Sequence, residues 1–177
     1  GKVLHPELVP GLYLVATPIG TAGDITLRAL DILARADVLA AEDTRQARKL
    51  MEIHGIRVGD RLLLPYHDHN GAAQRPRLLE LVRQGKSLAY VSDAGTPLVA
   101  DPGFKLAEAM IAEGLPVTSA PGASALLAAL SLAGLPTDRF TFAGFLPATS
   151  AARKVALREL ASVPTTLVLF ESPRRLA

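Results

Sequence analysis

Short apolar runs alternate with longer segments of helical periodicity over the first two thirds of the chain. The apolar runs predict β-strands at residues 12–16, 38–41, 62–64, 88–91 and 117–119. The segments between them predict helices at residues 26–36, 44–54, 74–84 and 104–113. Both sides of each strand are apolar, which is typical of a parallel sheet covered by helices on both faces. The pattern therefore predicts an α/β fold built from βαβ units.

The pattern changes after residue 120, where we place a domain boundary. Residues 1–120 are predicted to form an N-terminal α/β domain, and residues 121–177 to begin a C-terminal domain. In the second part we expect a helix, a strand, a helix and a strand, at residues 123–133, 141–145, 153–160 and 166–170. Ser172 is expected to cap one more helix with Pro173 in its first position. The second α/β domain is therefore expected to be incomplete and the chain truncated.

The composition excludes several classes of protein. Of the 177 residues, 49% are hydrophobic and 20% are charged, which excludes a disordered chain. There is no cysteine, so disulfides, thiolate nucleophiles and cysteine-ligated metals are excluded. No apolar run approaches the roughly 20 residues that cross a bilayer, and we expect a cytoplasmic protein without a membrane partner. A net charge of +2 does not by itself indicate a nucleic-acid binder.

The chemistry-bearing residues gather in five loops that follow predicted strands. These loops span residues 17–24, 42–45, 66–70, 92–103 and 121–124. In a parallel sheet, ligands bind outside the carboxyl ends of the strands, so these loops are expected to form one binding edge. The first loop has glycines in a GxxG spacing and contains no lysine, which differs from both the dinucleotide fingerprint and the P-loop. We interpret it as a tight turn rather than a phosphate cradle.

The loop at 92–103 carries the densest signal, with two Asp, two Pro and two Gly in twelve residues. Asp101 is expected to be the N-cap of the following helix, with Pro102 at its first position. That capping role leaves the start of the loop unexplained. We therefore predict a ligand-binding function for its first residues, Asp93, Ala94, Gly95 and Thr96.

Two histidines, His67 and His69, share one face of an extended segment, an arrangement that a metal ion could use. A third ligand is not evident nearby in the sequence. We interpret the histidines as hydrogen-bonded side chains that line the site, and we predict no metal.

A short acidic and basic run, residues 42–45, opens a predicted helix. Either Asp43 or Thr44 can cap this helix, and acids at this end complement the helix dipole. Capping and the helix dipole do not account for Arg45, nor for Arg48 and Lys49 one turn later. These cations are either a solvated helix face or contacts to a phosphodiester backbone.

Several motifs occur in the order expected of one family. They are ATPIG at 16–20, AEDTR at 41–45, YHDHN at 66–70, SDAGTPL at 92–98, DPG at 101–103, PG at 121–122, GLPTDRF at 134–140, GFLP at 144–147 and FESP at 170–173. Together they resemble the ribosomal RNA small subunit methyltransferase I family, within the tetrapyrrole methylase superfamily. The resemblance covers residues 12–176.

This resemblance implies a fold, a reaction and a set of partners. The fold would be the two-domain tetrapyrrole-methylase-like (class III) architecture, with S-adenosyl-L-methionine in the cleft between the domains. The reaction would be 2′-O-methylation of a cytidine ribose in the 16S rRNA of the small ribosomal subunit, commonly by a homodimer. Carried over position by position, the cofactor contacts would be Pro18, Asp93, Ala94, Gly95, Thr96, Pro121, Gly122, Ser124, Phe145 and Leu146.

The acceptor of such a reaction is a weak nucleophile, so a base or a hydrogen-bond acceptor would help. The candidates are Glu42, Asp43, His67 and His69, and the sequence does not rank them. Two other enzyme classes stay open: a tetrapyrrole or protein methyltransferase with the same cofactor, and a nicotinamide-dependent oxidoreductase, which the missing glycine fingerprint disfavours. A non-catalytic cofactor-binding module is the remaining alternative.

Overall fold

The computed structural model describes residues 8–99 and 101–171. The chain divides into two compact units, Gly1–Ser124 and Ala125–Ala177, so the division falls after Ser124 rather than after residue 120. The helix expected to begin at Ser172 lies outside the described residues. Within the described part of the chain, no helix has both the length and the apolar character that a membrane span requires.

The first unit is built on a parallel sheet of five strands in the order β3-β2-β4-β1-β5. The strands are β1 (Gly11–Val15), β2 (Val38–Ala41), β3 (Leu63–Pro65), β4 (Ser87–Val91) and β5 (Val117–Ala120). All five predicted strands are confirmed, with ends displaced by at most one residue. The parallel pairing places the carboxyl ends of all the strands, and the loops that follow them, at one edge of the sheet.

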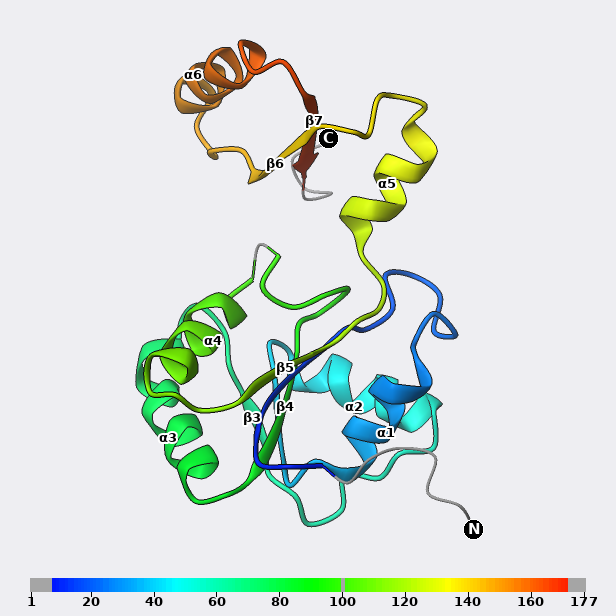
Figure 1. Cartoon of the computed structure of the whole chain (residues 1–177), viewed down its shortest axis with the longest axis vertical. Coiled ribbons are helices and arrows are strands. Elements are labelled where there is room, and N and C mark those ends of the chain that lie inside the picture. Colours follow the sequence, from blue (N-terminus) through cyan, green and yellow to red (C-terminus); the bar gives the residue numbers. More distant parts are fainter. Residues whose placement is uncertain (1–7, 100, 172–177) are drawn as a thin grey trace. The chain divides into compact units, whose positions relative to one another are not determined.

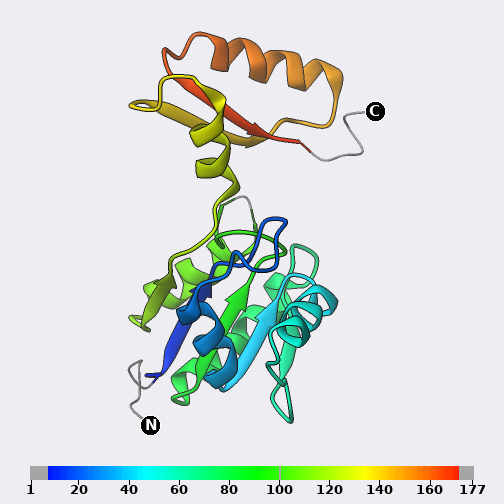
Figure 2. The ribbon, with the colours of Figure 1, turned by 90° about the vertical axis from the view of Figure 1, so that its right-hand side faces the viewer.

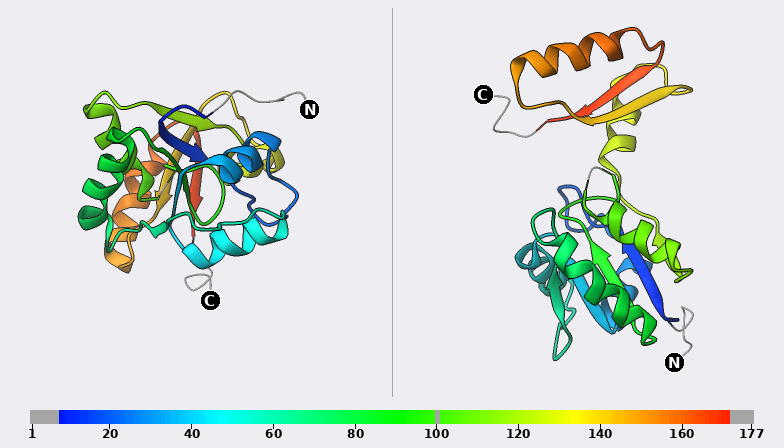
Figure 3. Two further views of the ribbon diagram at one scale, coloured as in Figure 1. Left: turned by 90° about the horizontal axis from the view of Figure 1, so that it is seen from below. Right: turned by 90° about the vertical axis from the view of Figure 1, so that its left-hand side faces the viewer.

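Helices cover both faces of this sheet (Figure 1; Figure 3). One face carries α1 (Leu27–Arg35) and α2 (Thr44–Ile53), and the other carries α3 (Gly71–Arg83) and α4 (Gly103–Ala112). Successive residues of β1 alternate between the two cores, with Leu12 and Leu14 packed under α3 and α4 and Tyr13 and Val15 packed under α1 and α2. The expected three-layer α/β arrangement is therefore confirmed.

Local hydrogen bonds explain where two of these helices begin. Thr26 Oγ1 accepts from the Ala29 N–H at 3.0 Å and caps α1. Of the two possible caps of α2, the structure uses Asp43, whose Oδ1 accepts from the Arg45 N–H at 2.9 Å. Helix α3 begins at Gly71, ahead of the predicted start at residue 74, although it contains a proline and no side chain caps it.

The start of α4 differs from the prediction. Pro102 occupies the N-cap and Gly103 is the first helical residue, so the assignment of Asp101 as N-cap and Pro102 as first residue is wrong by one position. The Asp101 carboxylate still accepts from the Gly103 N–H at 2.7 Å, and its other oxygen accepts from the Leu98 N–H at 2.8 Å. Asp101 therefore stabilises the loop before the helix as well as the helix end, including the left-handed backbone of Leu98 (φ 83°).

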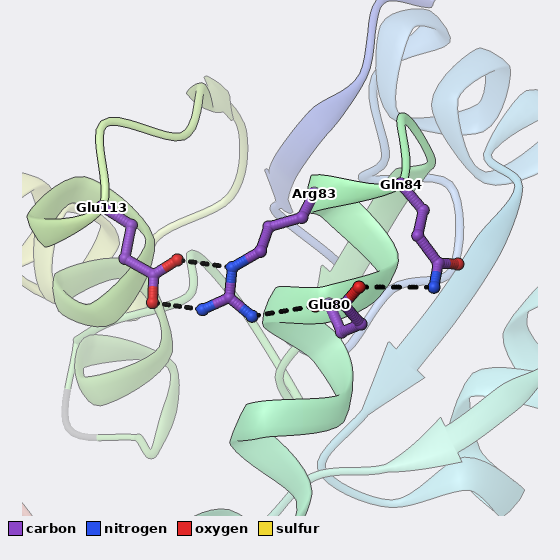
Figure 4. Close-up of polar contacts among 4 residues, drawn as sticks. All are labelled: Glu80, Arg83, Gln84 and Glu113. Carbon is purple, nitrogen blue, oxygen red and sulfur yellow. Dashed lines mark hydrogen bonds and ion pairs between the residues drawn. The ribbon is translucent and has the colours of Figure 1, made fainter.

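An ion-pair network joins α3 to the end of α4 (Figure 4). Arg83 Nε donates to Glu113 Oε2 at 2.8 Å, a second guanidinium nitrogen pairs with the same carboxylate, and Nη1 donates to Glu80 Oε2 at 3.0 Å. Gln84 Nε2 lies 3.5 Å from the other oxygen of Glu80. The groups are exposed, so the network aligns the two helices while contributing little to stability.

The second unit comprises α5 (Ala125–Ala133), β6 (Phe140–Phe145), α6 (Ser150–Ala161) and β7 (Thr166–Phe170). The two strands pair in parallel, with a register shift between Phe142 and Gly144, and α6 lies alongside them (Figure 2). The expected order of elements is confirmed, and α6 begins ahead of the predicted residue 153 because Thr149 caps it. Among the described residues of this unit only Leu130 is buried, so its core is small.

Candidate active site

Three of the five strand-end loops of the first unit are joined by hydrogen bonds. Thr17, after β1, and Gly95, after β4, exchange two backbone hydrogen bonds of 3.0 Å each. Thr96 Oγ1 donates to the backbone oxygen of Ala123, after β5, at 2.8 Å. These loops therefore form one continuous surface over the adjacent strands β4, β1 and β5.

Glycines on this surface bring backbone close to backbone. Gly95 has a left-handed conformation (φ 78°), and a Cβ there would lie 3.3 Å from the Ile19 side chain. A Cβ on Gly122 would lie 2.8 Å from the Ala16 Cβ. Because a side chain at either position would collide with the protein's own atoms, the two glycines allow these loops to pack closely together.

The structure brings the first-unit members of the predicted cofactor set into these joined loops: Pro18, Asp93, Ala94, Gly95, Thr96, Pro121, Gly122 and Ser124. The other two belong to the second unit. Phe145 ends β6 and makes an edge-on contact with Phe170 at 5.8 Å between ring centroids, and Leu146 follows it. Their role beside the first-unit loops stays a prediction.

A pair of acidic residues links the ends of the neighbouring strands β2 and β4. Glu42 Oε1 accepts a hydrogen bond from the Asp93 backbone N–H at 3.1 Å. Burial raises the pKa of Glu42, and the nearby charges of Asp93, Asp101 and Asp68 raise it further. Burial also raises the pKa of Asp93. Glu42 is therefore a carboxylate that holds a proton more readily than an ordinary surface glutamate does.

Asp43 has the opposite character. Hydrogen bonds from the backbone and side chain of Arg45 lower the pKa of its carboxyl group. Its oxygens serve as the cap of α2 and as the partner of the Arg45 guanidinium, 3.4 Å away. Asp43 is therefore a weak base that is already occupied by structural contacts.

The two histidines are hydrogen-bonded to their own loop. The His69 backbone N–H donates to His67 Nδ1 at 3.2 Å, so the proton of the neutral His67 ring is assigned to Nε2. The His67 N–H in turn donates to Asn70 Oδ1 at 2.8 Å. In this tautomer His67 presents a hydrogen-bond donor to its surroundings rather than a basic lone pair. Nowhere in residues 8–99 or 101–171 do three metal-ligating side chains gather in a possible metal site.

A pocket of about 350 Å³ lies between the first loop, α2 and the end of β4. It is lined by Thr17, Pro18, Gln46, Ala47, Lys49, Leu50, Ile53, Val91, Ser92 and Asp93. Three of these lining residues were not predicted from the sequence: Gln46, Leu50 and Ile53. Their i, i+4, i+7 spacing on one helix was the available signal, but it identifies a face without saying what that face opposes.

The three cations of α2 are exposed and lie near one another along the helix. Lys49 lines the pocket, while Arg48 borders a second, open cavity with Arg57. The side chain of Arg45 is 90% exposed despite its contact with Asp43. The structure thus keeps these cations available at the surface, on the same helix that walls the pocket.

The fold and these loops correspond to a known family. Residues 11–177 match the family model described as Tetrapyrrole (Corrin/Porphyrin) Methylases. The chain belongs to this family. A conserved hypothetical protein of known structure from Aeropyrum pernix K1 is 25% identical, with a TM-score of 0.68 over 94% of this chain and 60% of that one. The methyltransferase CobJ, at 22% identity, shows the same fold with a TM-score of 0.67 over 93% of this chain and 70% of that one.

Curated relatives in this tetrapyrrole methylase family are more similar in sequence. The protein named Ribosomal RNA small subunit methyltransferase I from Mesorhizobium japonicum is 54% identical over 96% of this chain and 57% of its own length. The protein of the same name from Micromonospora olivasterospora is 49% identical over 93% of this chain and 52% of its own length. The chain thus spans little more than half the length of these two relatives.

Proposed function

We propose that this chain belongs to an enzyme that transfers a methyl group from S-adenosyl-L-methionine to the ribose 2′-oxygen of a cytidine in 16S rRNA. The names of the curated relatives, at 46–54% identity, support the ribosomal RNA of the small subunit as the substrate. The geometric observation that carries the proposal is the set of hydrogen bonds from Thr17 to Gly95 and from Thr96 to Ala123, which unites three glycine-containing loops.

The residues present fit S-adenosyl-L-methionine better than a nucleotide phosphate. The cofactor carries a sulfonium, an amino-acid head group and an adenine, and none of the joined loops contains a lysine. Asp93 offers a carboxylate to the positive groups, and Gly95 and Gly122 let the loops that carry the other predicted contacts pack closely together. Thr96 and Ser124 add hydroxyl groups. When bound, the cofactor supplies the electrophilic methyl group.

Glu42 is the proposed proton acceptor. The ribose hydroxyl must lose its proton as its oxygen takes the methyl group, and a carboxylate with a raised pKa holds that proton well. Asp43 is a weaker base, and neutral His67 presents a donor at Nε2. Most of the acceleration is expected from holding the 2′-oxygen and the methyl donor in line, with Glu42 contributing the proton transfer.

The experiment that tests this function is a side-by-side transfer assay with methyl-labelled S-adenosyl-L-methionine. Small ribosomal subunits, free 16S rRNA, tetrapyrroles and bulk protein serve as acceptors, and the 54%-identical Mesorhizobium japonicum relative controls for the quality of each acceptor. Label in cytidine 2′-O-methyl nucleosides is the expected result. Label in tetrapyrrole or protein, with none in RNA, would assign the chain to another branch of the family.

A further inference from the structure

The pocket beside α2 has the dimensions and walls of a small-molecule site. Its volume of about 350 Å³ lies near the lower end of the range of roughly 300–1,000 Å³ typical of such sites. Leu50 and Ile53 of α2 form one wall, and Pro18 and Val91 contribute apolar surface from the loop and the sheet. Flat apolar groups can therefore be held between aliphatic side chains here.

Polar groups in the pocket lack partners. Thr17 is 3% exposed, and its hydroxyl is buried with no hydrogen-bond partner among the described residues. A buried hydroxyl left unpaired is destabilising, so a bound group that supplied a hydrogen bond would be favoured here. Gln46 projects an exposed carboxamide from α2 into the lining. These two groups add hydrogen-bond donors and acceptors beside the apolar side chains of the lining.

The pocket is separate from most of the loop surface proposed for the cofactor. Of that set, only Pro18 and Asp93 line the pocket, whereas Gly95, Thr96 and Gly122 do not. The joined loops follow β4, β1 and β5, while the pocket faces α2, which follows β2 on the other side of β4. The two sites thus share one border, as a methyl donor and its acceptor must.

The charge at the pocket favours an anionic acceptor. Lys49 is part of the lining, and Arg45 and Arg48 are exposed on the same helix. Asp93 is the one acidic residue of the lining, and it lies at the border with the cofactor loops. A ligand with an apolar, hydrogen-bonding ring and a phosphodiester at its edge matches this arrangement.

We propose that this pocket receives the pyrimidine base of the acceptor nucleotide, extruded from the RNA strand. The base lies between the aliphatic walls, the Gln46 carboxamide hydrogen-bonds its Watson–Crick edge, and Lys49 contacts the adjacent phosphate. A carboxamide offers both an acceptor and donors, which complements the amino group and the ring nitrogen of cytosine. This assignment rests on the proposed function, because it requires an RNA acceptor.

The test compares the affinity of the protein for two short single-stranded RNAs by fluorescence anisotropy. One RNA carries a single cytidine flanked by adenosines, and the other carries an abasic site in its place. The wild-type protein should bind the cytidine RNA roughly tenfold more tightly, since the hydrogen bonds from the Gln46 carboxamide to the base edge together contribute about that much. Gln46→Leu should remove most of this preference, and the matched control Gln84→Leu, at the exposed C-cap of α3, should keep it.

The possible results distinguish a failure of the pocket assignment from a failure of the proposed function. Equal affinity of the wild-type protein for both RNAs, with methyl transfer to RNA intact, overturns the pocket and leaves the function standing. A Gln46→Leu variant that loses affinity for S-adenosyl-L-methionine while keeping its base preference assigns the pocket to the cofactor instead. Absence of both RNA binding and methyl transfer to RNA by the wild-type protein overturns the proposed function, and the pocket assignment with it.

Discussion

At the scale of single residues, Glu42 combines its proposed role as proton acceptor with a cost in stability. Its folded-state pKa is raised by burial, so its charged form is disfavoured in the folded protein and its contribution to stability is lost as the pH rises through that pKa. Glu42→Gln, which keeps an acceptor for the Asp93 N–H, should therefore raise the free energy of unfolding at pH 7. Urea denaturation at pH 7 and near pH 4 should show a gain that shrinks toward acid, where wild-type Glu42 is protonated as well.

The same substitution should reduce catalysis. Loss of a general base typically lowers the rate by roughly 10²–10⁴-fold. Wild-type activity should fall as the pH drops through the raised pKa of Glu42, and the Gln variant should lack this acid limb. An acid limb that persists in Glu42→Gln would show that another group takes the proton.

Asp93 should affect cofactor affinity through its charge. Its side chain is exposed at the loop edge, and Asp93→Asn preserves its shape while removing the charge opposite the positive groups of S-adenosyl-L-methionine. We expect titration calorimetry to show about a tenfold weaker affinity, the size of one charged hydrogen bond. Asp60→Asn, an exposed control remote in sequence, should bind as the wild type does, and equal affinity in both variants would remove Asp93 from the site.

Residue-level prediction from the sequence was uneven for a physical reason. The cap of α2 could be narrowed to Asp43 or Thr44 because a cap depends on neighbours two or three residues away, and the structure uses Asp43. The role of Asp101 was displaced by one position because its carboxylate also holds the Leu98 N–H, a contact that depends on the path of the whole loop. Gln46 was missed because its place in the pocket lining depends on which segments lie opposite α2, and the local sequence does not show this.

At the scale of elements, the cap of α1 illustrates local stability. Thr26 Oγ1 satisfies the Ala29 N–H at the start of the helix, where no intrahelical acceptor is available. Thr26→Ala should lower the free energy of unfolding by about 1 kcal/mol, the usual effect of losing such a cap. Thr26→Ser keeps the hydroxyl and should lose much less. A denaturation midpoint for Ala equal to that for Ser would show that the helix end is stabilised by packing instead.

Helix α2 carries the interaction expected with the RNA backbone. Arg45→Glu reverses an exposed charge at its start and should weaken RNA binding more at low salt than at high salt, because phosphate contacts are screened. The slope of log affinity against log salt concentration should become shallower by about 1, as expected for the loss of one phosphate contact. Arg77→Glu, exposed on α3, gives the same change in net charge and serves as the control. If the two variants behave alike, only net charge matters and α2 is not the RNA-facing helix.

The elements themselves were largely readable from the sequence, because buried parallel strands are short continuous apolar runs and their helices have one apolar stripe. The starts of α3 and α6 were exceptions, since each helix begins three residues ahead of its predicted start. At α3, Gly71 is helical although no side chain caps the end, and it packs against the Tyr66 ring, where a Cβ would lie 3.4 Å away. That contact is tertiary, so the local pattern around Pro76 gave no sign of it.

At the scale of the whole molecule, the two units differ in how much they bury. The sheet of the first unit is covered by two apolar cores, whereas the described part of the second unit buries only Leu130 around two paired strands. A pair of strands with little core opens easily, so backbone amides of β6 and β7 should exchange with deuterium much faster than those of β1 and β4. Hydrogen exchange read by mass spectrometry measures this directly, and equal protection would contradict it.

Repeating that exchange measurement with saturating S-adenosyl-L-methionine tests the predicted cofactor residues of both units together. The loops at 93–96 and 121–124 should gain protection, because ligand binding to the folded state suppresses local opening. If Phe145 and Leu146 also contact the cofactor, the amides at the end of β6 should slow with the same dependence on cofactor concentration. Protection confined to the first unit would remove Phe145 and Leu146 from the cofactor site. The joined loops of the first unit would then be the part of this chain that binds the cofactor.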